Sequence, residues 1–348
     1  MVDFTVAICT YNGETRLPKV LEQLRIACDN KALSVACVSE NDDASSATEN
    51  TKKRSQFSAS TDKENFSWEI LVIDNNSTDN TAKIVQEYQA NWSKTYPIQY
   101  LFEPKQGIAF ARRCAIKNAK GSLIGFLDDD NLPTPNWVNE AYTFSQLHPN
   151  AGAYGSQIHG DYEVEPPENF KRIACFLAII ERGQKPFRYE AKQGLFPVGA
   201  GLVIRKQAWL SSVPERPILK GVSAQSLTSK GEDIETLSYI QKAGWEIWYN
   251  PKMQIYHQIP RSRLEKAYLL KLFRGVGLSR YPTRMIRFEV WQRPFVLPFY
   301  IANDLRRLIT HFIKYRKYLK TDIVVICELE LFLSSLISPF YHWLFVDK

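Results

Sequence analysis

The chain has 348 residues, of which 45% are hydrophobic and 23% charged. These proportions exclude a wholly disordered protein and suit one large α/β domain, or a domain with an appendage. The formal net charge is +7, but residues 261–320 carry fifteen Lys or Arg against three acidic residues, a net +12, which leaves −5 for the remainder. One region is basic, and the rest of the chain is not.

Six cysteines are scattered along the chain without the spacing of metal ligands. They lie mostly in apolar runs, so we expect reduced thiols in the core, as in a cytosolic protein. The N-terminal residues enter a strand-like run without a basic segment or an apolar stretch of signal-peptide length. We therefore expect a cytosol-facing protein.

The first 155 residues alternate strand-like and helix-like patterns, which predicts βαβ units and a mostly parallel sheet. Continuous apolar runs indicate buried strands at 4–9, 70–73, 98–102 and 122–127. Apolar residues spaced by three and four indicate helices, one containing Leu17, Val20, Leu21 and Leu24, one containing Ile84, Val85 and Tyr88, and one over 107–119.

The pattern is less regular elsewhere. Residues 29–67 are rich in Ser, Asp, Asn, Lys and Glu, which predicts a solvated, partly disordered insertion. After residue 155 we expect a helix at 169–181, a short strand at 202–204, a helix at 234–243, and a long helical C-terminal region.

Polar residues follow three of the predicted strands directly. Thr10-Tyr11-Asn12 ends the first, Asp74-Asn75-Asn76 the second, and Asp128-Asp129-Asp130 the fourth. In an open parallel sheet, ligands bind outside the carboxyl ends of the strands, so these segments are the first candidates for a site. Asn, Asp and Ser are also ordinary turn and cap residues, and for Asn12 or Asn76 alone the two interpretations carry equal weight.

The three consecutive carboxylates at 128–130 are less easily explained as a turn. Like charges at one strand end raise one another's pKa unless a cation neutralises them. Mg²⁺ and Mn²⁺ prefer oxygen ligands and are commonly held by one or two carboxylates together with phosphate oxygens. The triplet therefore predicts a divalent metal site.

Four segments resemble, in order, the motifs of family 2 glycosyltransferases of the GT-A fold: Phe4–Asn12, Glu69–Asp79, Gly107–Arg112 and Phe126–Asn131. The resemblance implies a GT-A α/β fold, a mostly parallel central sheet flanked by helices, with a C-terminal helical extension. It implies that Asp128 and Asp130 form a metal-binding D-x-D. The donor-binding residues it implies are Thr10, Tyr11, Asn12, Asp74, Gly107, Arg112 and Asp128.

The sequence departs from the family pattern at Arg113, where the family often has Asn, and at Asn131, where it often has a further Asp. The second half extends the likeness. Pro197–Arg205 resembles a glycine-containing segment of the acceptor side, and Ile204 at the third glycine position excludes a dinucleotide-binding loop.

Lys230–Glu235 matches the Glu-Asp pair that supplies the catalytic base of the family. The resemblance implies Asp233 as the base, with Glu232 as its competitor; the alternative is an acidic pair that stabilises a helix N-terminus through the dipole. His257 is the one histidine we single out, as a metal or phosphate contact or equally as a structural histidine.

These observations together predict a domain over 1–260, with a nucleotide and metal half at 1–155 and an acceptor half at 156–260, followed by a basic helical region at 261–348. The expected activity is an inverting, metal-dependent transfer from a UDP-linked or other nucleotide-diphosphate sugar to a saccharide or lipid-linked saccharide in surface polysaccharide biosynthesis. Processive members carry Gln-x-x-Arg-Trp, which is absent here, so transfer of a single sugar is expected.

Two other functions remain open. One is an inactive sugar-nucleotide-binding partner of a membrane polysaccharide complex, which predicts loss of the Asp triplet or of Asp233; the other is a sugar nucleotidyltransferase, which would open with a glycine-rich basic loop. The block Tyr256–Leu264 is similar to HpsE-like polysaccharide-cluster members. A homo-oligomer is also left open.

The basic region alternates charge with aromatic and aliphatic residues, which suits an anionic membrane surface better than a nucleic acid. No uninterrupted apolar run reaches the ~20 residues of a spanning helix. We expect peripheral attachment to the cytoplasmic face through 261–346; the alternative is packing against the acidic catalytic part. The predicted anchors are Tyr268, Leu269, Phe273, Tyr281, Trp291, Phe295, Phe299 and Tyr300.

Overall fold

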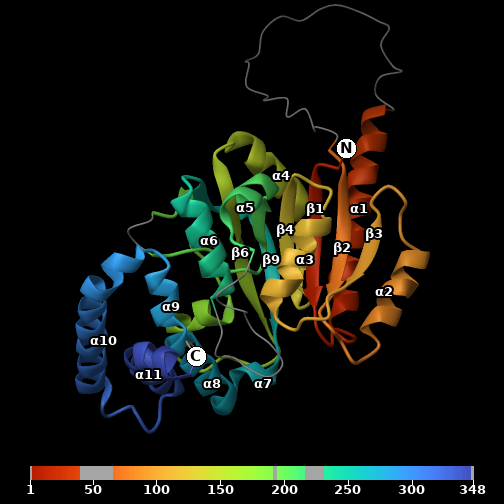
Figure 1. Ribbon diagram of the computed structural model, residues 1–348. Helices are drawn as coiled ribbons and strands as arrows, with labels where there is room; N and C mark the ends of the chain where they lie inside the picture. Colours follow the sequence, from red (N-terminus) through yellow and green to blue (C-terminus); the bar gives the residue numbers. More distant parts are fainter. Residues whose placement is uncertain (1, 40–65, 191–193, 216–230, 346–348) are drawn as a thin grey trace, which may run out of the picture.

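A single mixed β-sheet organises the computed structural model, which describes residues 2–39, 66–190, 194–215 and 231–345 (Figure 1). The strands lie in the order β3-β2-β1-β4-β8-β6-β9-β5, and β7 pairs with β9. Their bounds are β1 Phe4–Thr10, β2 Trp68–Asp74, β3 Ile98–Phe102, β4 Leu123–Asp128, β5 Asn131–Pro133, β6 Ala151–Tyr162, β7 Phe187–Arg188, β8 Leu202–Arg205 and β9 Glu246–Ile259.

Strands β3, β2, β1 and β4 are parallel, and their apolar side chains form the centre of the main core. In the register of β1, Thr10 lies opposite Asp74 of β2, and Cys9 lies opposite Asp128 of β4. β8 runs antiparallel to β4 and β6, while β6 and β9 are parallel. The predicted GT-A α/β architecture is confirmed, and the polar ends of β1, β2 and β4 meet at one edge.

Helices flank this sheet, and β3 with α2 lies at the opposite end of the molecule from α10 (Figure 1). The helices before the C-terminal region are α1 Leu17–Ser39, α2 Thr81–Ala90, α3 Ile108–Asn118, α4 Trp137–Leu147, α5 Lys206–Ser212 and α6 Glu232–Lys242. The C-terminal helices are α7 Arg261–Leu264, α8 Lys266–Leu278, α9 Arg280–Met285, α10 Arg293–Tyr315 and α11 Ile323–Phe345.

Three sequence expectations need correction. The insertion predicted at 29–67 begins too early, because α1 continues to Ser39; residues 40–65 lie outside the described part of the chain. The helix expected at 169–181 is instead two short 3₁₀ turns, Phe170–Arg172 and Ala174–Leu177. The long strands β6 and β9 were not predicted, because both contain polar residues and their pairing has a register shift after Ser156.

The C-terminal helices pack against the catalytic part through a second hydrophobic core. This core joins the 3₁₀ turns after β6 to α8 and α11. Leu269 and Phe273 are fully buried in it, so they are wrong as predicted membrane anchors. Trp291, Phe295 and Phe299 are exposed.

Helix α11 has the length and composition to cross a membrane over Ile323–Leu344, and 39% of that window is buried inside the protein. No apolar run was expected to reach spanning length without interruption; this helix passes a test of length and mean hydropathy although Glu328 and Glu330 interrupt it. The same test is passed by core helices of soluble proteins, so it does not by itself place the helix in a bilayer.

Gly125 in β4 provides a test of the main core. A Cβ there would lie 2.6 Å from Trp137 Cη2 and 2.8 Å from Phe4 Cζ, two rings that pack edge to face. Gly125→Val should therefore lower the free energy of unfolding by about 1–3 kcal/mol, the usual cost of overpacking. Gln99→Val on the half-buried outer strand β3 is the control in denaturant titrations. Equal stability of the two variants would contradict this packing.

Candidate active site

The loops after β1 and β2 are bound to each other, so they form one continuous edge. Asn12 Oδ1 accepts a hydrogen bond from Thr78 N at 2.9 Å, and Asn12 N donates to Ser77 Oγ at 2.9 Å. Asn12 has a φ of 50°, a left-handed conformation that Asn adopts more readily than most residues. Gly13 N donates to Thr81 Oγ1 at 2.9 Å. Both predicted donor-binding loops therefore lie together.

Asp74 and Gly107 lie at the same edge and shape its loops. Both oxygens of the buried Asp74 carboxylate accept hydrogen bonds, from Ser77 N at 2.9 Å and from the Tyr100 hydroxyl at 2.7 Å. Gly107, which precedes α3, donates its N–H to Asn75 Oδ1 at 2.8 Å. The side chain of Asp74 holds the turn after β2, so the loops at this edge are held in place by hydrogen bonds within the protein.

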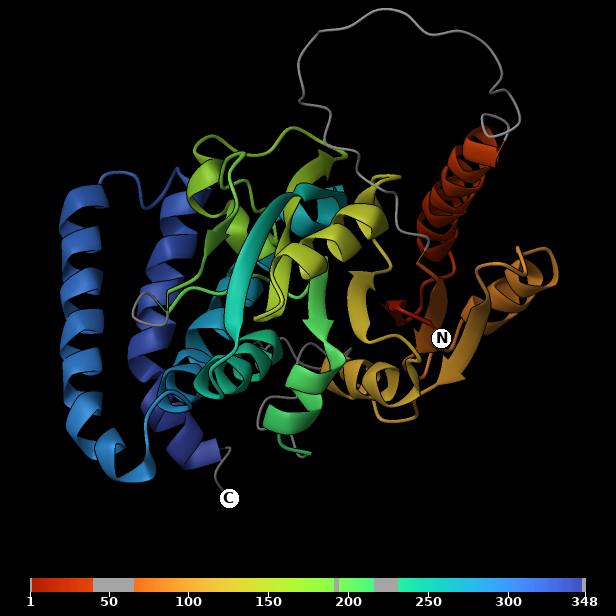
Figure 2. The same ribbon diagram turned by 90° about the horizontal axis from the view of Figure 1, so that it is seen from above.

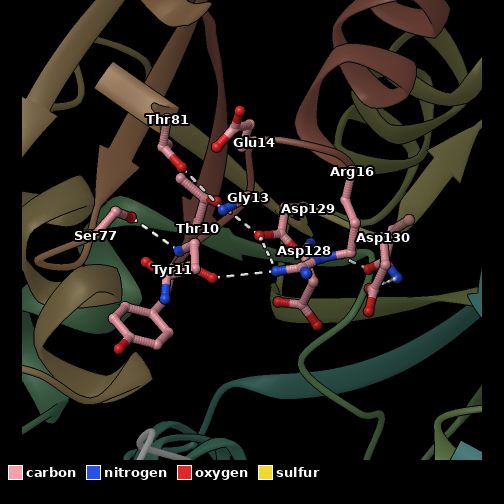
Figure 3. Close-up of polar contacts among 12 residues, drawn as sticks. Thr10, Tyr11, Gly13, Glu14, Arg16, Ser77, Thr81, Asp128, Asp129 and Asp130 are labelled. Carbon is pink, nitrogen blue, oxygen red and sulfur yellow. Dashed lines mark hydrogen bonds and ion pairs between the residues drawn. The ribbon is translucent and has the colours of Figure 1, made fainter. Parts of the chain in front are cut away.

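The three carboxylates of the 128–130 triplet point to three different partners. Asp129 accepts hydrogen bonds from Thr10 Oγ1 at 2.6 Å and from two nitrogens of Arg16, at 2.9 and 3.0 Å (Figure 3). Arg16 also donates to Tyr11 O at 3.1 Å. The Thr10 hydroxyl therefore donates its hydrogen bond to Asp129 of the triplet. Arg16 was missed, because an Arg just before a helix is ordinarily a solvated surface residue.

Asp130 meets residues that are more than a hundred positions away in the sequence. Arg263 of α7 donates to Asp130 Oδ2 at 2.7 Å, and His257 Nε2 lies 3.4 Å from Asp130 Oδ1. The β5–β9 ladder causes this, because it sets Asn131 opposite His257. Burial opposes ionisation of Asp130, but His257 and Arg263 outweigh it and hold the pKa of Asp130 well below its usual range.

His257 is buried, and its two ring nitrogens differ. Nε2 lies 2.9 Å from Arg263 Nη1, which can only donate, and 3.4 Å from Asp130 Oδ1, which can only accept when ionised, so the tautomer decides which of them it binds. Nδ1 has no hydrogen-bond partner within the described residues. His257, which the sequence singled out as a metal or phosphate contact or equally as a structural histidine, lies beside Asp130. Nothing in the sequence singled out Arg263.

Asp128 is linked through Arg112 to the acceptor half. The buried Arg112 lies 3.9 Å from Asp128 Oδ1 and donates to Glu232 Oε1 at 3.1 Å. Burial raises the pKa of Asp128, an effect that Arg112 opposes and Asp130 reinforces. Gly199 makes room for the guanidinium, since a Cβ there would lie 2.1 Å from Arg112 Nη2.

Glu232 and Asp233 open α6 after Gly231, whose φ of 105° suits glycine. Asp233 Oδ2 accepts a hydrogen bond from Gly199 N at 3.0 Å, which ties the base candidate to the Pro197–Arg205 segment. Burial and the neighbouring Asp233 raise the pKa of Glu232 to about 7 against the pull of Arg112. The two acids therefore have different surroundings.

The triplet is electrically balanced by Arg16, Arg112 and Arg263. Repulsion among its carboxylates consequently does not by itself require a metal ion, and that step of the sequence argument is corrected. Within the described ranges, no group of three or more His, Cys, Asp or Glu is arranged to hold a metal. Asp130 Oδ1 and His257 Nε2 lie 3.4 Å apart, close enough to bind one ion together, but Arg263 contacts both residues, so an ion there would have to displace its guanidinium.

Comparison with known proteins finds a similarity to one family over part of the chain. The model described as glycosyl transferase family 2 matches residues 54–209, which include β2, β4 and the Asp triplet. The succinoglycan biosynthesis protein ExoM of Rhizobium meliloti is 22% identical over 205 residues, covering 58% of this chain and 60% of that protein. Over less than half of its length, the chain is similar to the family 2 glycosyltransferases.

Other relatives agree with this family. The UDP-Glc:alpha-D-GlcNAc-diphosphoundecaprenol beta-1,3-glucosyltransferase WfgD of Escherichia coli is 35% identical over 97 residues, 28% of this chain and 35% of that protein. The mannosyltransferase PcManGT of Pyrobaculum calidifontis, solved with GDP-Man and Mn²⁺, superimposes with a TM-score of 0.53 over 99% of this chain and 87% of its own, at 15% identity. That likeness shows the fold.

The match to these two relatives is partial in length. This chain spans about 60% of ExoM and less of WfgD. The HpsE-like subgroup stays a prediction. So do the donor, metal and base roles of the residues placed above.

The raised pKa of Glu232 gives a prediction about stability. Folding moves this pKa from 4.5 to about 7, so the native state binds the proton more tightly than the unfolded chain. The resulting stabilisation is complete below pH 4.5 and is lost as the pH rises through 7. The Glu232→Gln side chain does not titrate, so the variant cannot lose this stabilisation. Its stability relative to wild type should therefore increase between pH 5 and pH 8, by on the order of 3 kcal/mol in the free energy of unfolding, and its melting temperature should rise accordingly.

Calorimetry or fluorescence melts at several pH values measure this difference. Glu14→Gln is the control, because Glu14 lies in the same edge loops but caps an exposed turn. A constant difference between Glu232→Gln and wild type across this pH range would mean that Glu232 titrates normally.

Proposed function

We propose that this glycosyltransferase moves a sugar from a UDP-linked or other nucleotide-diphosphate sugar to a saccharide or lipid-linked saccharide, with inversion of the anomeric centre. One observation carries the proposal: two contacts join the donor side to the acceptor side at one sheet edge. Arg112 lies against Asp128 on the donor side and donates to Glu232 on the acceptor side. Gly199 N, on the acceptor side, donates to Asp233. The names of relatives support the substrate class, since WfgD uses UDP-Glc and a diphosphoundecaprenol-linked acceptor.

In this proposal, the edge formed by Asn12, Asp74 and Gly107 receives the nucleotide. Arg112 stands between donor and acceptor sides and, with its charge held by Asp128 and Glu232, contributes positive potential where the diphosphate leaves. A divalent ion, when bound by Asp130, Asp128 and His257, would supply further neutralisation of the leaving diphosphate.

Asp233 is the base in this scheme. Glu232 is committed to Arg112, and its role is to position that guanidinium. Asp233 is held by a backbone N–H of Gly199 and by its own helix, at Ile234 N, and makes no ion pair within the described residues. It can therefore accept a proton from an acceptor hydroxyl on the side opposite the leaving group, which gives inversion.

A sugar-nucleotide-binding partner without activity is the rival. That protein would bind UDP without turnover. Loss of the Asp triplet or of Asp233, which the rival predicts, is not seen in this chain. Nucleotide binding does not separate the two functions, so the donor site and the chemistry are tested separately.

The donor-site test is UDP binding by calorimetry with Mn²⁺ and with EDTA. Mn²⁺ should tighten binding at least about tenfold, because neutralising phosphate charge is worth several kcal/mol. Asp130→Asn should abolish this gain. Asp161→Asn, a carboxylate change at the exposed end of β6, is the control and should keep it. Equal UDP affinity with Mn²⁺ and EDTA in the wild type would remove the metal from the proposal.

The chemistry test is Asp233→Asn. Loss of a general base should lower kcat by about 10² to 10⁴ while UDP affinity stays within about twofold of wild type. Glu232→Gln, which disturbs Arg112, should instead weaken UDP binding as well. The measurements are a screen of nucleotide sugars with soluble acceptors, and NMR of the product anomer. Wild-type turnover by Asp233→Asn, or a retained configuration, would overturn the assignment; absence of turnover in wild type with every donor would favour the inactive partner.

A further inference from the structure

The C-terminal half of α11 is packed with its polar side chains inward. Ser334, Ser335, Ser338 and His342 are buried. The outward face carries only apolar residues in this half, spaced by three and four: Leu333, Ile337, Phe340, Trp343 and Leu344, all exposed. A helix packed on a water-soluble protein normally shows the reverse arrangement.

The buried serines lie where α11 approaches α8 closely. A Cβ on Gly277 of α8 would lie 2.5 Å from Ser334 Cβ and 2.9 Å from Leu331 O, so only glycine permits this approach. Ser338 Oγ donates to Leu278 O, and His342 Nε2 lies 3.1 Å from the same carbonyl. Small residues and serine hydrogen bonds at a helix contact are the packing used when the outer faces are surrounded by lipid.

Helix α10 has the same inverted pattern. Its two buried residues are both polar: Asp304 forms an ion pair with Arg284, and His311 contacts Val325 O at 3.0 Å. The outward residues Phe295 and Phe299 are 70% and 78% exposed, and Trp291 just before the helix continues their spacing of four. Figure 2 shows α10 and α11 side by side at the end of the molecule remote from β3.

Charge identifies what covers these faces. Residues 293–320 contain one acid, Asp304, which is buried and paired. The exposed cations along α10 and the turn after it are Arg306, Arg307, Lys314, Arg316, Lys317 and Lys320. A second copy of this chain would bring two such basic surfaces together, whereas an anionic bilayer offers both apolar chains and negative headgroups.

We infer that the outward faces of α10 and α11 form a surface that embeds in one leaflet of an anionic lipid bilayer. α11 does not cross it, because α8 and α10 pack along its sides. This surface keeps the predicted anchors Phe295 and Phe299, drops the buried Leu269 and Phe273, and adds Ile337, Phe340 and Trp343 of α11.

This surface is close along the chain to the site. Arg263, which binds Asp130, lies three residues before α8, and α8 packs on α11. If the proposed function holds, attachment brings the sheet edge to the bilayer where a lipid-linked acceptor resides. Binding to vesicles is measured without turnover, so failure of either proposal is distinguishable from failure of the other.

The experiment is flotation of the full chain with vesicles of phosphatidylcholine alone or with about a third phosphatidylglycerol. Wild type should float with the anionic vesicles and less at high salt. The double variant Phe295→Glu, Phe299→Glu should lower binding on the order of 10-fold or more. Leu147→Glu with Leu210→Glu, two changes at similarly exposed apolar residues of α4 and α5, is the matched control and should bind as wild type.

UDP affinity and melting temperature, measured on all variants, show that the sheet edge and the fold are intact. Two results would overturn the inference. One is wild type that stays unbound with both vesicles at low salt. The other is a vesicle-independent dimer, seen by sedimentation, that the Phe295 and Phe299 changes dissociate, which would assign the surface to self-association.

Discussion

Three carboxylates in a row at the end of a buried strand can persist only if each is compensated, and the structure supplies an arginine to each. Arg16 comes from the turn before α1, Arg112 from α3 and Arg263 from α7. The carboxylates of Asp129 and Asp130 are 10% and 6% exposed, so water can compensate little of their charge if their arginines are removed. The pairing at Asp128–Asp130 therefore ties the first loop, the donor half and the C-terminal region to a single strand end.

The sequence was sufficient to predict the part of the fold whose strands have simple apolar patterns. β1, β2 and β4 each contain a run of at least four apolar residues or glycine, so their burial and the meeting of Thr10, Asp74 and Asp128 at one edge could be predicted from the pattern. β6 and β9 were not found, since residues such as Gln157 and Asn250 break any apolar alternation and are buried by hydrogen bonds that only the tertiary fold provides.

The site was predictable for residues that end strands and not for those that reach it from afar. His257 and Asp130 meet through the β5–β9 register, and Arg263 arrives because α7 starts where β9 ends. An arginine on a predicted helix is ordinarily solvated, so neither Arg16 nor Arg263 carried a signal. The metal was inferred from repulsion within the triplet, and the arginines show why that argument was incomplete: cations close to the carboxylates were already present in the chain.

The C-terminal region shows the same limit for apolar patterns. Its serines appeared to interrupt an apolar segment, whereas in the structure they form the contact face with Gly277 and leave the apolar side chains outside. In the structure, the basic charge of this region and the outward apolar side chains of α10 and α11 lie on the same part of the molecule. Arg263 of α7, which binds Asp130, lies three residues before α8, and α8 packs on α11. The surface that faces away from the sheet and the edge that holds the triplet are thus mechanically joined by a few residues of α7 and α8.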